Sequence, residues 1–313
     1  MKNKELYQLL KDKKQLKNIS IDNKININNT FNPNKIIYNL DNLENLLFDS
    51  KKETAKEIAT RIKHKIFTDK KIYNAFCKFP NSILSIEKDL KTSKNSKNGY
   101  ITGIQYLYNL KQFCSHAKIA NCFKTCIVHT GNAIVFQNIN IFRLVKALFK
   151  IQYPNEYLKL LKKDTEKLLR IAKKKNLKPC IRLNGTSDIE YEKDPNIFNY
   201  IKYYTIQHDI KYYDYTKKPL RNTQGFIDLT FSYSNEIKYK KYVNIALAKK
   251  MRIAVVIHEK VIAKYVKQGF LYSNMVNGDD NDLTFLKPNN STLYLKAKGF
   301  LPSSKDNNFM LVN

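Results

Sequence analysis

Three cysteines lie within thirteen residues of the segment FCSHAKIANCFKTC. Cys114, Cys122 and Cys126 are separated by seven and three residues, so a helix would place Cys122 and Cys126, at i and i+4, on one face. Thiolates suit an iron–sulfur cluster or zinc, and His116 or His129 would be the fourth ligand of a structural zinc. The spacing matches no standard zinc finger. The cluster of cysteines favours a metal site, and an iron–sulfur cluster is favoured over zinc. The alternative is that the three cysteines are buried and unreactive.

Polar side chains follow several apolar runs that have the character of strands. After LKPCIRLNG (177–185), a glycine at 185 would let the backbone turn sharply beside a ligand. Ordinary helix caps and surface packing are the alternative, and for a single histidine the structural role is the commoner one. The candidate ligand-binding residues are Arg182, Asn184, Ser187, Asp188, Asp214, Thr216, Lys217, Ser232 and His258.

The segment NGDDNDLTFLKP (277–288) gathers three carboxylates in four residues, at 279, 280 and 282. It is reminiscent of a calcium loop but lacks the glutamate that closes an EF-hand loop. A turn is the first interpretation. A weaker one is a hydrolytic enzyme in which Asp279 and Asp282 hold a divalent ion.

Predicted strands and helices alternate through most of the chain, at intervals of about 25–40 residues. Strands are expected in 99–110, 177–185, 210–216, 226–234 and 252–260, and helices in 143–151, 156–175, 197–206, 244–251 and 261–269. Such alternation indicates parallel βαβ units, in a barrel or an open sheet, with ligands outside the carboxyl ends of the strands. We expect an α/β fold, a complete or partial (β/α) barrel.

The N-terminal third has a different composition from the rest of the chain. Residues 1–95 are rich in lysine and asparagine and are predicted to form a basic helical extension. The polar stretch KTSKNSKNG (91–99) has the composition of a linker, so we place the barrel-like domain at 96–313.

The chain carries 56 Lys and Arg against 27 Asp and Glu, a formal net charge of +29. Codon bias can explain why lysine is abundant, but it explains less well why basic residues outnumber acidic residues about twofold. We therefore expect a polyanionic partner, a nucleic acid. Tyrosines beside the cations in YYDYTKKPLR (212–221) could stack on bases. The predicted phosphate contacts are Arg143, Lys146, Lys217, Lys218 and Arg221. With no signal peptide or membrane-spanning run visible, we expect a cytoplasmic protein that does not bind membranes.

Several motifs in the same order resemble a family of phage and plasmid proteins related to the gene product 88-like group. They are C-x7-C-x3-C, RLNGTSDIEYE, YDYTK, LTFSYS, NGDDNDLTF and YLKAKGF, within about 100–313. The resemblance implies a divergent radical-SAM-like barrel with the cysteines near its open mouth and an iron–sulfur cluster. The cysteine spacing departs from the usual C-x3-C-x2-C, which counts against the use of S-adenosylmethionine.

Two functions therefore remain in view. The first is an iron–sulfur, radical-SAM-like protein of a mobile element that acts on or with nucleic acid. The second is a non-enzymatic DNA- or RNA-binding replication protein with zinc or no metal at the cysteines. The chain contains no Walker loop, G-x-G-x-x-G, G-x-S-x-G or H-E-x-x-H motif, so the sequence leaves open whether it is an enzyme.

Overall fold

The computed structural model describes residues 40, 42–50, 53–76, 80–87, 90–123, 126–129, 137–297 and 311. Its centre is one eight-stranded sheet in the order β1-β2-β3-β4-β5-β6-β8-β7. Neighbouring strands are parallel except for β1, which runs antiparallel to β2. The strands are β1 (Leu84–Ile86), β2 (Tyr100–Gln105), β3 (Lys178–Arg182), β4 (Lys211–Thr216), β5 (Ile227–Ser232), β6 (Ile253–Ile257), β7 (Met275–Asn277) and β8 (Thr292–Lys296).

The predicted α/β class and its alternation of strands and helices are confirmed. Each expected strand region contains a strand, and β2 to β6 follow one another across the sheet in chain order. The sheet is open, however, with β1 at one edge and β7 at the other, so the closed form of the predicted barrel is wrong.

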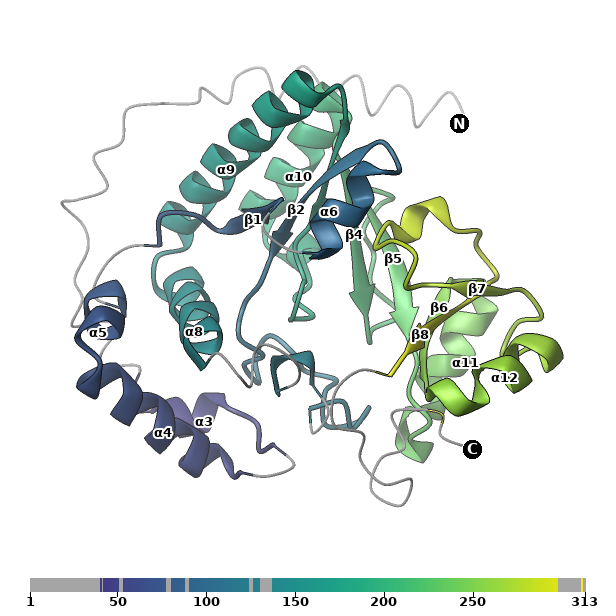
Figure 1. Cartoon of the computed structure of the whole chain (residues 1–313), viewed down its shortest axis with the longest axis horizontal. Helices are drawn as coiled ribbons and strands as arrows, with labels where there is room; N and C mark the ends of the chain where they lie inside the picture. The colour runs from purple at the N-terminus through teal and green to yellow at the C-terminus, as the bar shows by residue number, and fades with distance from the viewer. Residues whose placement is uncertain are drawn as a thin grey trace.

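Long helices cover one face of the sheet near β2 to β4 (Figure 1). They are α9 (Pro154–Lys175) and α10 (Pro195–His208), and α8 (Gln137–Gln152) packs against α9. In α9 the apolar face buries Leu160, Leu161 and Leu168, while the lysines lie on the other side. A Cβ atom on Gly103 of β2 would lie 3.5 Å from the Leu168 side chain, which shows how closely α9 approaches the strand.

The opposite face of the sheet is also filled. The Thr102 hydroxyl, one residue from Gly103 and therefore on the other face, accepts a 2.8 Å hydrogen bond from Asn95 of α6 (Leu90–Ser96). The side-chain carbonyl oxygen of Asn95 accepts in turn from the backbone N–H of Asp282 at 3.1 Å, so α6 holds the 278–286 segment. Leu283 packs there with Tyr213. These elements occupy the face that a closed barrel would turn inward.

The smaller helices lie at the two ends of the sheet (Figure 1). α11 (Lys240–Ala248) and α12 (Ile262–Gln268) belong to the apolar cluster around β5 and β6. At the other end lie α3 (Leu43–Leu46), α4 (Ala55–Thr68) and α5 (Lys70–Phe76). α4 begins at a capping box between Thr54 and Glu57. None of the described helices is both long and apolar enough to cross a bilayer.

The predicted linker at 91–99 is largely helical, because α6 occupies it. β1, on the N-terminal side of the predicted boundary, pairs with β2 and so belongs to the sheet. The division into two domains at residue 95 stays a prediction, and residues 1–39 of the expected extension lie outside the described residues.

Candidate functional site

The loop that carries the cysteines, described at residues 106–123 and 126, follows β2 and crosses the carboxyl edge of the sheet. At its start, the Gly185 N–H donates to the Gln105 carbonyl at 2.9 Å. At its middle, the Asp188 N–H donates to the Phe113 carbonyl at 3.2 Å. Further along, the Ser234 hydroxyl donates to the Ala120 carbonyl at 2.7 Å. The loop is thus fixed to the segments that follow β3 and β5.

Gly185 is required by the close approach of two backbone segments. A Cβ atom at this position would lie 2.5 Å from the Gln105 carbonyl oxygen and 2.8 Å from the Tyr106 ring. The structure therefore explains this glycine by its contact with the start of the cysteine loop, while its predicted role beside a ligand stays a prediction.

Asp188 ties together the ends of β3, β4 and β5. Its carboxylate accepts from the Thr216 hydroxyl at 2.8 Å and from the Lys217 N–H at 2.9 Å. The Lys217 ammonium in turn donates to the backbone carbonyls of Ser232, at 2.9 Å, and Tyr233, at 2.8 Å. Burial lowers the pKa of Lys217 to about 8. The structure brings these predicted residues together, with Ser232 taking part through its backbone.

Asn184 and Asp214 form a second pair at the same edge. The Asp214 carboxylate accepts from the Asn184 N–H at 2.8 Å and from the Asn184 side-chain amide at 3.0 Å. Burial raises the pKa of Asp214 to about 7, although the charge of Arg221 and the bonds from Asn184 favour the ionised form. The Ser187 hydroxyl donates to the Asn184 side chain at 2.9 Å, so Ser187 supports the pair.

The raised pKa of Asp214 predicts a pH-dependent stability. The folded chain holds the proton more tightly than the unfolded chain, so stability is fully present below the ordinary value of 3.8 and is lost as pH rises through about 7. In this window the free energy of unfolding should fall by up to about 1.4 kcal/mol per pH unit, the effect of one linked proton. Urea unfolding of wild type and Asp214→Asn at several pH values measures it, and equal slopes for the two proteins would contradict it.

Arg182 is engaged on the opposite face of the sheet. Its guanidinium donates to both carboxylate oxygens of Asp282, at 2.8 and 2.9 Å, and lies 4.6 Å from the centre of the Tyr215 ring. Asp279 accepts from the backbone N–H of Lys296 at 2.7 Å. Protein donors therefore already hold both carboxylates that the divalent-ion hypothesis needs, and that interpretation loses its support.

His258 lies at the end of β6, where its contacts are local. The His258 Nδ1 accepts from the Lys260 N–H at 3.2 Å, and the backbone N–H donates to the Leu311 carbonyl. The structure does not bring this side chain into the hydrogen-bonded group of Asp188, so its predicted ligand role gains no support.

The three loop cysteines lie near one another, but not on a helix. The chain between 111 and 123 consists of turns, so the predicted helical face of Cys122 and Cys126 is wrong. Burial, followed by the nearby Cys126, Asp188 and Cys122, raises the pKa of Cys114 well above its usual value. All three thiols are free, as is Cys180, which is buried against Thr102 away from the loop.

The donor chemistry of these thiols fits a soft metal centre, but the arrangement is not a preformed site. Among the side chains that the structure describes, no three of His, Cys, Asp or Glu are placed to hold a metal ion. The His116 ring packs edge-on against Tyr242 at 4.8 Å. The other predicted fourth ligand, the His129 side chain, is outside the described part of the chain.

The model of the family described as Gene product 88 matches residues 82–311. The chain belongs to the gene product 88 family. The match begins just before β1 and ends at Leu311, which bridges to β6, so the family region contains the whole sheet and the cysteine loop. No curated protein and no solved structure matches the chain. The phage-type family is thereby established, and the likeness to radical-SAM barrels stays a prediction.

Within the family region, three predicted phosphate contacts point into the protein. Lys217 holds the carbonyls described above. The Lys218 ammonium donates to Glu190 at 3.0 Å, and Arg221 donates to both Glu192 oxygens at 2.8 and 2.7 Å. Of the tyrosines predicted to stack on bases, Tyr212 and Tyr213 are buried. These side chains are structural in the folded chain.

The other two predicted contacts lie on α8. The Lys146 ammonium donates to the Ile83 carbonyl at 3.2 Å. Arg143 is half-buried beside the cysteine loop. The exposed cations of α9 were not among the predicted phosphate contacts, although their spacing along the predicted helix is visible in the sequence.

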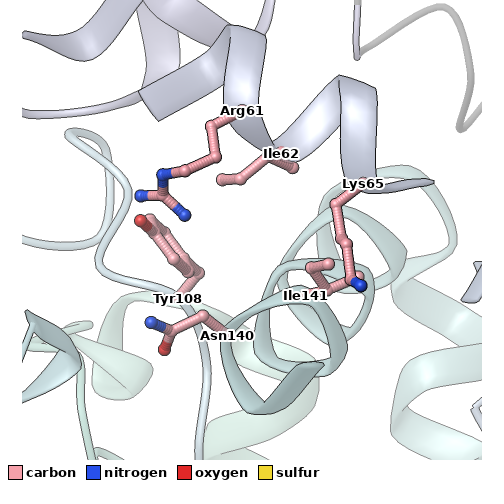
Figure 2. A pocket seen from close by; sticks show the side chains of 6 residues that line it. All are labelled: Arg61, Ile62, Lys65, Tyr108, Asn140 and Ile141. Atoms are coloured by element: carbon pink, nitrogen blue, oxygen red, sulfur yellow. The ribbon is translucent and has the colours of Figure 1, made fainter. Parts of the chain in front are cut away.

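A small cavity lies behind the cysteine loop, between α4 and α8 (Figure 2). Its volume is about 10 Å³, at the lower limit for one water molecule. Figure 2 shows the Tyr108 hydroxyl pointing toward the Arg61 guanidinium, which Glu53 already binds at 2.8 and 2.9 Å. The cavity is too small to be a ligand site.

Proposed function

We propose that this family member binds nucleic acid through the exposed face of α9. Five cations follow one another along that face at spacings of four, four, three and four residues, which keeps them on one side of a helix. They span about 22 Å at 1.5 Å per residue. We name them the α9 row: Lys159, Lys163, Lys167, Arg170 and Lys174.

The single observation that carries the proposal is that these charges are both exposed and unneutralised. Within the described chain, no carboxylate lies within ion-pair distance of any member of the α9 row. The neighbouring Lys175, in contrast, is paired with Glu87 at 2.5 Å. Glu166 beside the row accepts from the Tyr204 hydroxyl at 2.6 Å. A line of free cations suits the phosphates of a nucleic-acid backbone.

The bulk charge supports the same partner. A net charge of +29 repels itself unless counterions or a polyanion neutralise it. Each phosphate contact releases condensed counterions and lowers the slope of log K against log salt by about 0.9 on duplex DNA.

The experiment is a binding titration of wild type with a short duplex and with its single strand. We expect affinity to fall by about two to four orders of magnitude between roughly 50 and 200 mM salt if five or more phosphates are contacted. Fluorescence anisotropy measures it. An affinity that does not change with salt would reject binding through phosphate contacts of the α9 row, and no binding at low salt would reject nucleic acid as the partner.

A second candidate function is a thiolate-bound metal centre, an iron–sulfur cluster or zinc, held by Cys114, Cys122 and Cys126. The proximity of the three free thiols to one another, beside Asp188, favours it. A three-cysteine cluster leaves one iron free for an outside ligand and supplies electron transfer when bound. The protein's part is to supply the thiols and to keep them out of water.

The expected result is a coloured protein after anaerobic reconstitution with iron and sulfide. Iron and sulfide analysis should show the cluster in wild type and in Cys180→Ser, and its loss when the three loop cysteines become serine. A parallel incubation with zinc distinguishes the two centres. If wild type binds no metal, or if the triple variant binds as much metal as wild type, this candidate function is rejected.

A further inference from the structure

Arg143 of α8 has no described counter-charge. Its guanidinium lies 5.3 Å from the centre of the Tyr106 ring, and one of its N–H groups donates to Asn140 at 3.4 Å. The nearest ionisable groups around it are Tyr106, Cys126 and Tyr108, and none of them is a carboxylate. A guanidinium has five N–H donors, so most of its capacity is unused.

The other arginines packed into the described body differ from Arg143 in this respect. Arg61 is paired with Glu53, Arg182 with Asp282, Arg221 with Glu192 and Arg252 with Asp228. A partly buried cation without an anion destabilises the fold, and each of these other arginines avoids that cost by pairing with an Asp or Glu side chain. The position therefore suits an anion from outside.

A second, independent observation points to the same place. Asn109 is 3% exposed, and its side-chain carbonyl oxygen has no hydrogen-bond partner in the described chain. Its amide interacts with the Cys126 thiol, which is also a neighbour of Arg143. A buried acceptor without a donor is destabilising, because it has lost its hydrogen bonds to water, so this oxygen suits a ligand that donates a hydrogen bond.

We propose that Arg143 and Asn109, beside Cys126, form a binding site for a small oxyanion that also carries a hydroxyl group. The guanidinium binds the anionic oxygens, and the Asn109 carbonyl accepts from the hydroxyl. Hydrogen phosphate and α-hydroxycarboxylates have this chemistry. Sulfate and acetate supply the charge without the hydroxyl. The site is distinct from the α9 row, which faces solvent on another helix.

The test is calorimetric titration of the metal-free protein in high salt, which suppresses general binding to a basic surface. Phosphate should bind wild type about tenfold more tightly than sulfate, and lactate more tightly than acetate, because only one of each pair satisfies Asn109. Arg143→Gln should weaken phosphate about tenfold or more, since a charge-assisted bond is removed. Arg143→Lys, which keeps the charge but not the fork, should bind less tightly than wild type.

Lys249→Gln is the control, because it removes an exposed cation outside the α9 row and should leave phosphate binding unchanged. Equal phosphate and sulfate affinity in wild type, or phosphate binding that survives Arg143→Gln, would overturn the site. Nucleic-acid binding by Arg143→Gln separates the two proposals: it should match wild type, and a nucleic-acid defect without a phosphate defect would also count against the site.

Discussion

Replacing the five cations of the α9 row by glutamine should weaken nucleic-acid binding on the order of 100-fold at low salt. Glutamine has nearly the helix propensity of lysine and arginine, so α9 should remain folded. The slope of log K against log salt should become shallower by about 0.9 for each phosphate that the variant no longer binds. Anisotropy titrations at several salt concentrations measure both quantities, and circular dichroism checks the fold.

The control removes the same charge from another part of the surface. Five exposed lysines between β5 and β7 are replaced by glutamine in one variant: Lys238, Lys240, Lys249, Lys260 and Lys267. This variant should bind within a few-fold of wild type, because long-range attraction is screened beyond about 10 Å in ordinary salt. An equal loss of affinity in the two variants would mean that general charge, rather than the α9 row, attracts the nucleic acid.

The second large effect is expected from Asp282, which is buried on the other face of the sheet. Asp282→Ala leaves the Arg182 guanidinium without its carboxylate and the Tyr213 hydroxyl without its acceptor. Breaking a buried pair in this way costs about 3–5 kcal/mol. Urea unfolding followed by circular dichroism measures the change in the free energy of unfolding.

Two comparison proteins make the Asp282 result interpretable. Lys211→Gln removes an exposed pair with Asp209 and should change stability by less than about 1 kcal/mol. Replacing Arg182 by Met together with Asp282 by Leu should cost less than Asp282→Ala alone, because no unpaired charge remains. A loss for Asp282→Ala as small as that for Lys211→Gln would show that the pair does not anchor the 278–286 segment.

Local patterns in the sequence were sufficient for strands β2 to β6, but not for the short edge strands β1 and β7. Apolar runs such as FIDLTFSYS and RIAVVIHEK mark β5 and β6, and the leucine spacing of 156–175 marks α9. Because parallel strands present their carboxyl ends at one edge, Asp188, Thr216 and Lys217 were expected at the same edge, and the structure adds the hydrogen bonds between them.

Contacts between distant segments could not be predicted in the same way. Arg182 and Asp282 are 100 residues apart, and each alone could equally be a ligand-binding residue. The face of the sheet opposite α9 is covered in part by α6, whose sequence LKTSKNS has the polar composition of a linker. Asn95, which anchors it to Thr102, is fully buried although asparagine is usually exposed.

The predicted cysteine helix failed for a local reason. The Ala120 N–H does donate to the His116 carbonyl, as in one turn of helix, but Asn121 then adopts a left-handed conformation with φ of 52°. Asparagine tolerates this conformation and commonly ends helices with it, so Cys122 follows a turn. Likewise, Lys218 and Arg221 have the pattern of surface cations because their partners, Glu190 and Glu192, come from another loop.

Lysine footprinting tests the nucleic-acid interface most directly. The protein is acetylated briefly with and without a saturating duplex, and the modified lysines are identified by mass spectrometry. Bound nucleic acid should protect Lys159, Lys163, Lys167 and Lys174 while Lys238, Lys240 and Lys249 stay equally reactive. Protection of the second group, with α9 unprotected in the complex, would contradict the proposed interface.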